Sequence, residues 1–159
     1  MTTGEVEAHL SVAWKELLAD GYSLVLYKDG RRLYASSEDG MRPLLDAIDA
    51  VGLPQLAGVL VVDKVVGKAA ALLIAYIRAS EVFAGLISVA GQTLLRRRGI
   101  TTEADAIVPE ICDVTGHAVC PFERLVDRTD DPGEGYRLVR ERVRELSGRP
   151  FTRSTGAAP

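Results

Sequence analysis

A polar group of residues interrupts the most apolar stretch of the chain, VLVVDKVVGKAAALLIAYI at residues 59–77. Within six positions this stretch carries Asp63, Lys64, Gly67 and Lys68. Charged side chains are costly in a protein interior unless they are paired or solvated, so we expect the chain to reach the surface here. These four residues form the first candidate binding site.

The chemistry that this group predicts is the binding of an anion at the start of a helix. Free amide groups and the helix dipole attract negative charge there, Gly67 permits close backbone approach, and the two lysines add positive charge. Asp63 could accept hydrogen bonds from ribose hydroxyls, or act as a nucleophile that forms a ribosyl ester. The group therefore predicts a nucleotide or an ADP-ribose-like ligand, without the motifs that specify ATP or NAD. The alternative is that Asp63 caps the helix, Gly67 serves packing and both lysines are solvated.

A second group of reactive residues lies in CDVTGHAVCPFE, where Cys112, His117 and Cys120 fall within nine positions. Cys120 precedes a proline at a predicted helix start, where the dipole favours a thiolate and His117 could accept the proton. This arrangement predicts a cysteine-dependent transferase or hydrolase. The alternative is that Cys120 is a small buried cap and Glu123 completes the capping. Two cysteines eight residues apart with no fourth ligand do not match a zinc site, so we expect no metal and no cofactor.

The elements that would position these residues follow from periodicity and turn signals. Asp29-Gly30 separates two runs of β-forming residues and predicts a hairpin. Polar residues 63–68 are predicted to lie where a strand passes into a helix. We expect strands at about 22–28, 31–35, 55–63, 81–88 and 106–111, and helices at about 5–19, 40–52, 64–79, 90–99, 120–128 and 131–146.

This order of elements predicts an α/β fold, a three-layer α/β/α sandwich with a mixed, mostly parallel sheet. In open sheets of this kind, ligands bind beyond the carboxyl ends of the strands, next to the following helix. Ser88, Gly91 and Gln92 begin the next predicted helix. We therefore expect them to line the same crevice as Asp63.

Length and composition restrict the class of protein. With 159 residues, 47% hydrophobic and 26% charged, we expect one domain over 5–147 and a disordered polar tail over 148–159. A net charge of −3 disfavours binding to long nucleic acids. No apolar run reaches the roughly 20 residues of a membrane-spanning helix, and the acidic start does not resemble a secretory signal. These features predict a cytoplasmic protein that does not bind membranes.

Three segments resemble the prokaryotic family called domain of unknown function 1893: DKVVGKAAALL at 63–73, FAGLIS at 83–88 and CPFERLV at 120–126. Together with the helix, hairpin and helix before them, the resemblance extends over about residues 8–145. It implies a cytidine deaminase-like fold that lacks the catalytic zinc. The family brings no established activity.

The residues themselves also disfavour zinc chemistry. A zinc deaminase needs His or Cys with Glu at one helix start and Pro-Cys-x-x-Cys at the next. The corresponding starts here read DKVVGKAAA and SVAGQTLL, and neither contains those residues. Whether the chain is an enzyme stays open. A third hypothesis is a structural or regulatory module that forms a homodimer through the apolar helix at 69–77.

Overall fold

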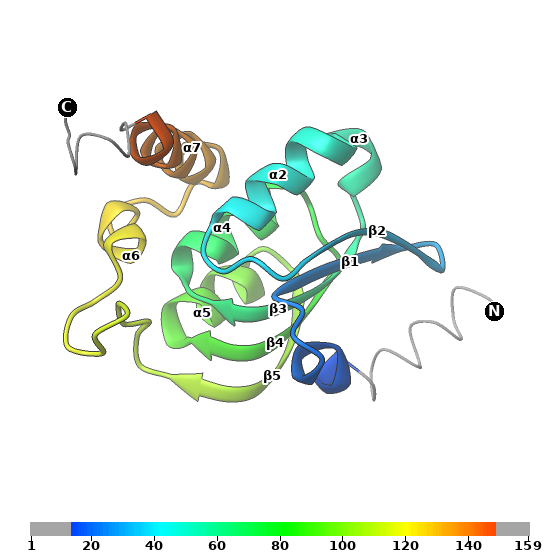
Figure 1. Cartoon of the computed structure of the whole chain (residues 1–159), viewed down its shortest axis with the longest axis horizontal. Helices are drawn as coiled ribbons and strands as arrows, with labels where there is room; N and C mark the ends of the chain where they lie inside the picture. The colour runs from blue at the N-terminus through cyan, green and yellow to red at the C-terminus, as the bar shows by residue number, and fades with distance from the viewer. Residues whose placement is uncertain (1–13, 149–159) are drawn as a thin grey trace, which may run out of the picture.

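The computed structural model describes residues 14–148, and a mixed sheet of five strands lies at its centre (Figure 1). The strand order is β2-β1-β3-β4-β5. β1 is antiparallel to both β2 and β3, whereas β3, β4 and β5 run parallel. The strands are Leu24–Lys28, Arg31–Ser36, Leu60–Val66, Glu81–Ser88 and Thr101–Val108 in chain order. The predicted α/β fold with a mixed sheet is confirmed.

Turn residues place the first elements as predicted. Asp29 and Gly30 join β1 to β2 with positive φ angles of 50° and 75°, as a tight hairpin turn requires. The next helix, α2 (Arg42–Val51), has proline in its first turn and ends at Gly52, whose φ of 90° favours glycine. A short helix not predicted from the sequence, α3 (Leu53–Leu56), follows it.

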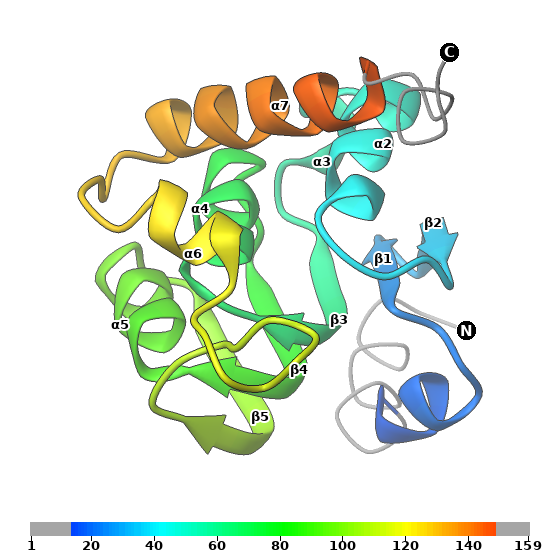
Figure 2. The same cartoon turned by 60° about the vertical axis from the view of Figure 1, so that its left-hand side comes forward.

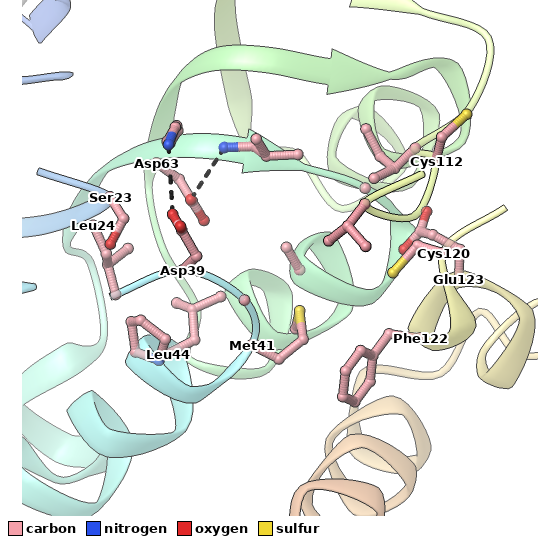
Figure 3. Close-up of a pocket in the computed structure, with 18 residues that line it drawn as sticks. Ser23, Leu24, Asp39, Met41, Leu44, Asp63, Cys112, Cys120, Phe122 and Glu123 are labelled. Atoms are coloured by element: carbon pink, nitrogen blue, oxygen red, sulfur yellow. Dashed lines mark hydrogen bonds and ion pairs between the residues drawn. The ribbon is translucent and has the colours of Figure 1, made fainter. Parts of the chain in front are cut away.

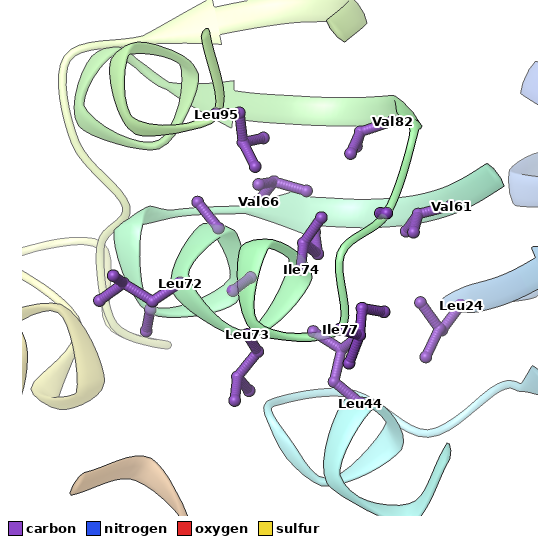
Figure 4. Close-up of a cluster of buried hydrophobic side chains, with 14 of the residues drawn as sticks. Leu24, Leu44, Val61, Val66, Leu72, Leu73, Ile74, Ile77, Val82 and Leu95 are labelled. Atoms are coloured by element: carbon purple, nitrogen blue, oxygen red, sulfur yellow. The ribbon is translucent and has the colours of Figure 1, made fainter. Parts of the chain in front are cut away.

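Helices cover both faces of the sheet. One face packs against α2, α4 (Lys68–Tyr76) and α5 (Val89–Arg97), and these elements enclose the larger cluster of buried side chains (Figure 4). The opposite face packs against the helical residues 14–19. There Trp14 stacks on Phe83 with ring centroids 6.0 Å apart. The remainder of the predicted first helix, residues 5–13, and the tail after Gly148 lie outside the described residues.

The two last helices, α6 (Pro121–Leu125) and α7 (Pro132–Gly148), lie outside α4 (Figure 2). Gly135 permits the close packing of α7, because a Cβ atom there would lie 2.8 Å from the side chain of Leu72. Arg140 also joins α7 to α2 through two bonds to the Asp49 carboxylate, at 2.6 and 2.8 Å. This contact lowers the pKa of Asp49 below its ordinary value. No helix of the described residues has the length and apolar character needed to cross a membrane.

Several predicted boundaries are wrong. The strand predicted to end at Asp63 continues to Val66, and α4 begins at Lys68 rather than at Lys64. The β-branched pair Val65 and Val66 extends β3 by pairing with Leu86 and Ile87 of β4. The last strand also lies earlier than expected, at Thr101–Val108 instead of 106–111, because its residues continue the parallel pairing with β4.

Candidate functional site

A cavity of about 380 Å³ lies between β1, β3, the starts of α2 and α4, and the segment at 109–123 (Figure 3). Most of its wall is apolar. The wall includes Leu24, Met41, Leu44, Ala70, Ile111 and Phe122. Volumes in this range and walls of this kind are typical of sites that bind small organic molecules.

Asp63 is the buried acid of this cavity. It occupies the middle of β3, is 9% exposed, and lines the cavity. Its Oδ1 atom accepts one long hydrogen bond, 3.4 Å, from the amide of Val65. No side chain within residues 14–148 donates to this carboxyl group. Burial raises the pKa of Asp63 to about 7, so the group is partly protonated near neutral pH. A carboxyl with these properties in a cavity is a candidate functional group.

Lys64 and Asp39 lie at the rim of the same cavity. The Lys64 Nζ atom is 3.4 Å from Asp39 Oδ1, and both side chains are mostly exposed. An exposed pair of this kind contributes little to stability. Gly67 also lines the cavity, so the structure brings together three of the predicted ligand-binding residues: Asp63, Lys64 and Gly67.

The amide groups at the start of α4 are not open to a ligand. The amide of Lys68 donates to Glu123 Oε1 at 2.7 Å, and that of Ala69 donates to Oε2 at 2.8 Å. A Cβ atom on Gly67 would lie 2.5 Å from the same carboxylate. An anion does lie at this helix start, but it is the carboxylate of Glu123. The prediction that it comes from a ligand is contradicted, because Glu123 supplies it from α6.

Lys68 does not face the cavity. Its Nζ atom binds Asp130 Oδ1 at 2.9 Å and the carbonyl oxygen of Asp127 at 3.0 Å. The hydrogen bond and the charge of Lys68 lower the pKa of Asp130. Lys68 therefore joins α4 to the connection between α6 and α7, and its predicted place in the cavity is wrong.

The residues that begin α5 also lie outside the cavity. Ser88 is buried and its Oγ atom accepts a hydrogen bond from the amide of Gly91 at 3.0 Å, which caps the helix. Gly91 packs against the backbone of Gly67. Neither these two residues nor Gln92 lines the cavity. The reason is the position of the cavity. The cavity opens over β1 and β3, whereas the prediction placed a crevice between β3 and β4.

Both cysteines line the cavity, at the end opposite to Asp63 (Figure 3). Cys120 is the residue just before the first turn of α6, as predicted, and is half-buried, whereas Cys112 is exposed. His117 does not line the cavity, and within residues 14–148 no hydrogen bond joins its imidazole to Cys120. The described residues contain no group of three or more His, Cys, Asp and Glu that could hold a metal ion.

The exposures of the cysteines predict their order of alkylation. We expect iodoacetamide at neutral pH to label Cys112 faster than Cys120, because Cys112 is exposed and no base among residues 14–148 is bonded to the half-buried Cys120 thiol. Peptide mass spectrometry over a time course measures both rates, and Cys120→Ser serves as the control. Faster labelling of Cys120 would instead favour the cysteine-dependent enzyme.

Sequence reasoning missed the role of Glu123 and the contribution of α2. The alternative to a reactive Cys120 predicts that Glu123 completes the capping around Cys120, whereas its carboxylate caps α4. Met41 and Leu44 carried no signal, because apolar residues near a helix start also suit an ordinary core. Only their position opposite Asp63 places them in a candidate site.

Comparison with known proteins gives a family but no activity. The family model described as Domain of unknown function (DUF1893) matches residues 12–143. The crystal structure of a DUF1893 family protein from Thermotoga maritima is similar, with a TM-score of 0.73 and 28% sequence identity. The similarity covers 89% of this chain and 92% of that one. No curated protein matches the chain.

Proposed function

Because this chain belongs to the DUF1893 family, whose description names no activity, we propose its function from the cavity: it binds a small organic ligand at Asp63. One observation carries this proposal. A carboxyl group that is nine-tenths buried faces an apolar cavity, and no side chain of the described residues bonds to it. Burying a polar group without a good partner is costly, and such a cost is typical of functional sites.

The proposed ligand is of the nucleotide type, with its nucleoside part inside the cavity. A flat base fits against apolar side chains such as Leu44 and Phe122, and hydroxyl or amino groups would donate to Asp63. Phosphate groups have no place at the start of α4, because Glu123 already binds those amides. Any phosphates would therefore extend past the rim, towards Lys64.

A zinc-dependent reaction is not part of this proposal. The helix starts lack the required His, Cys and Glu residues. The cytidine deaminase-like classification of the fold stays a prediction, which the order of helix, hairpin and alternating elements supports. Catalysis by Asp63 or by Cys120 also stays a prediction, as do the homodimer and the cytoplasmic location.

Titration of adenosine, cytidine, NAD and ADP-ribose tests the proposal. We expect at least one of them to bind the wild type, and Asp63→Ala to weaken that binding tenfold or more, because the cavity loses its polar contact. Isothermal titration calorimetry gives the affinities. Asp39→Ala, which removes an exposed rim carboxylate, is the control and should change affinity little. If none of them binds, or if Asp63→Ala binds equally well, the proposal fails.

A further inference from the structure

The side chains inside the cavity can accept hydrogen bonds from a ligand but have few donors to give to it. The Ser23 hydroxyl is bonded to the carbonyl oxygens of Ser36, at 3.0 Å, and of Glu38. The Lys64 ammonium group pairs with Asp39. Inside the cavity, the one side-chain hydroxyl donor of the lining therefore already has partners, and the only ammonium group of the lining lies at the exposed rim.

The carboxylates of the cavity differ in how many hydrogen bonds they already accept from the protein. Both oxygens of Glu123 are bonded to amides of α4. Asp63 accepts one long bond at Oδ1 from the amide of Val65, and the backbone amide of Lys64 also favours its charged form, but no side chain of the described residues donates to either oxygen. A carboxylate accepts hydrogen bonds through both oxygens, so Asp63 can accept two donors from one ligand. Inside the cavity, a ligand therefore makes its polar contact by donating hydrogen bonds to Asp63.

The charges of the lining residues also favour a ligand that donates hydrogen bonds and carries a positive charge. Three carboxyl groups line the cavity, those of Asp39, Asp63 and Glu123, against one lysine. The apolar wall lowers the local dielectric constant, which strengthens attraction of a cation and repulsion of an anion. Charge and hydrogen-bonding capacity thus select the same kind of ligand.

We propose that the end of the ligand that enters this cavity is cationic and donor-rich, with two N–H groups on one planar edge, as in an amidinium group. Such an edge matches a carboxylate with two parallel hydrogen bonds, and its flat apolar body would pack between Leu44 and Phe122. Anionic parts of the ligand stay outside. This inference rests on the proposed function and narrows it: of the nucleotide-type ligands, it favours those whose base carries a positive charge.

Three probes of equal shape and different charge test the inference: benzamidine, benzamide and benzoate. We expect the wild type to bind benzamidine at least tenfold more tightly than benzamide and to show no binding of benzoate. Asp63→Asn keeps the shape of the side chain and should abolish the preference for benzamidine. Asp39→Asn removes a rim carboxylate and should change the benzamidine affinity less than threefold. Chemical-shift perturbation measures the affinities and locates the bound probe.

A second measurement uses only the wild type, in case Asp63→Asn does not fold. Because burial raises the pKa of Asp63 to about 7, benzamidine affinity should rise about tenfold between pH 6 and pH 8, as the carboxyl group ionises. Benzamidine affinity that falls as the pH rises from 6 to 8 overturns the inference, because ionisation of the carboxyl group can only strengthen its attraction for a cation.

The remaining outcomes separate this inference from the proposed function. Benzoate or benzamide binding as tightly as benzamidine overturns the cationic end but leaves a small-ligand cavity. Benzamidine binding that Asp63→Asn does not weaken also overturns it. If no probe binds while a nucleoside binds through Asp63, the cationic end is wrong and the proposed function stands. If no probe and no nucleoside binds, both fail.

Discussion

Asp63→Asn is expected to become more stable relative to the wild type as the pH rises from 5 to 8.5. Burial raises the pKa of Asp63 from 3.8 to about 7, so the folded wild type holds a proton that the unfolded chain releases. The associated stability is fully present below pH 3.8 and is lost as the pH rises through about 7. A shift of this size corresponds to about 4 kcal/mol in total, of which about 3 kcal/mol falls between pH 5 and pH 8.5. Asparagine has no proton to release, so the variant does not lose this stability as the pH rises.

Urea unfolding at a series of pH values measures the effect as the difference in unfolding free energy between the variant and the wild type. Using the difference removes the contributions of other carboxyl groups, such as Asp49, whose lowered pKa acts in the opposite direction. Asp39→Asn is the matched control, because Asp39 lies at the rim of the same cavity but is exposed. The difference in unfolding free energy between Asp39→Asn and the wild type should vary by less than about 0.5 kcal/mol over this pH range. Parallel stability curves for Asp63→Asn and the wild type would show that the carboxyl group is solvated.

Glu123→Ala is expected to lower the free energy of unfolding by about 2–3 kcal/mol. The variant loses two charge-assisted hydrogen bonds to the start of α4 and leaves two amides without their partner. Gly67→Ala should cost a similar amount for the same reason. Its Cβ atom would lie 2.5 Å from the Glu123 carboxylate, which would have to leave the amides. The φ angle of Gly67 is −93°, so the backbone itself tolerates alanine.

A double-mutant cycle tests whether both variants remove the same contact. The combined variant Gly67→Ala/Glu123→Ala should cost at least about 1 kcal/mol less than the sum of the single losses, because the bonds can be lost only once. Chemical denaturation gives the four free energies. Glu110→Ala, which changes an exposed residue of the same segment, is the control and should stay within about 0.5 kcal/mol of the wild type. Strictly additive losses would mean that Glu123 and Gly67 act independently.

The sequence by itself determined most of the elements. The Asp29-Gly30 turn, the β-branched strand before residue 63 and the proline and glycine around α2 are local signals, and local backbone preferences govern such features. The strand over residues 81–88 was predicted with the bounds that the structure has. Helix starts were less certain. The change from valine to alanine around Lys64 resembles a helix start, but pairing with β4 carries β3 on to Val66.

The composition of the candidate site was decided by tertiary structure. Residues 63–68 look like one polar group in the sequence. In the structure, Asp63 faces the cavity, whereas Lys68 lies outside the cavity and binds Asp130. The anion predicted for the start of α4 is Glu123, which is 54 residues from Ala69 in the chain. Local spacing encodes the periodicity of a strand or a helix, but it carries no information on which distant segment packs there. That choice depends on the path of the whole chain, which brings α6 onto α4 and α2 opposite Asp63.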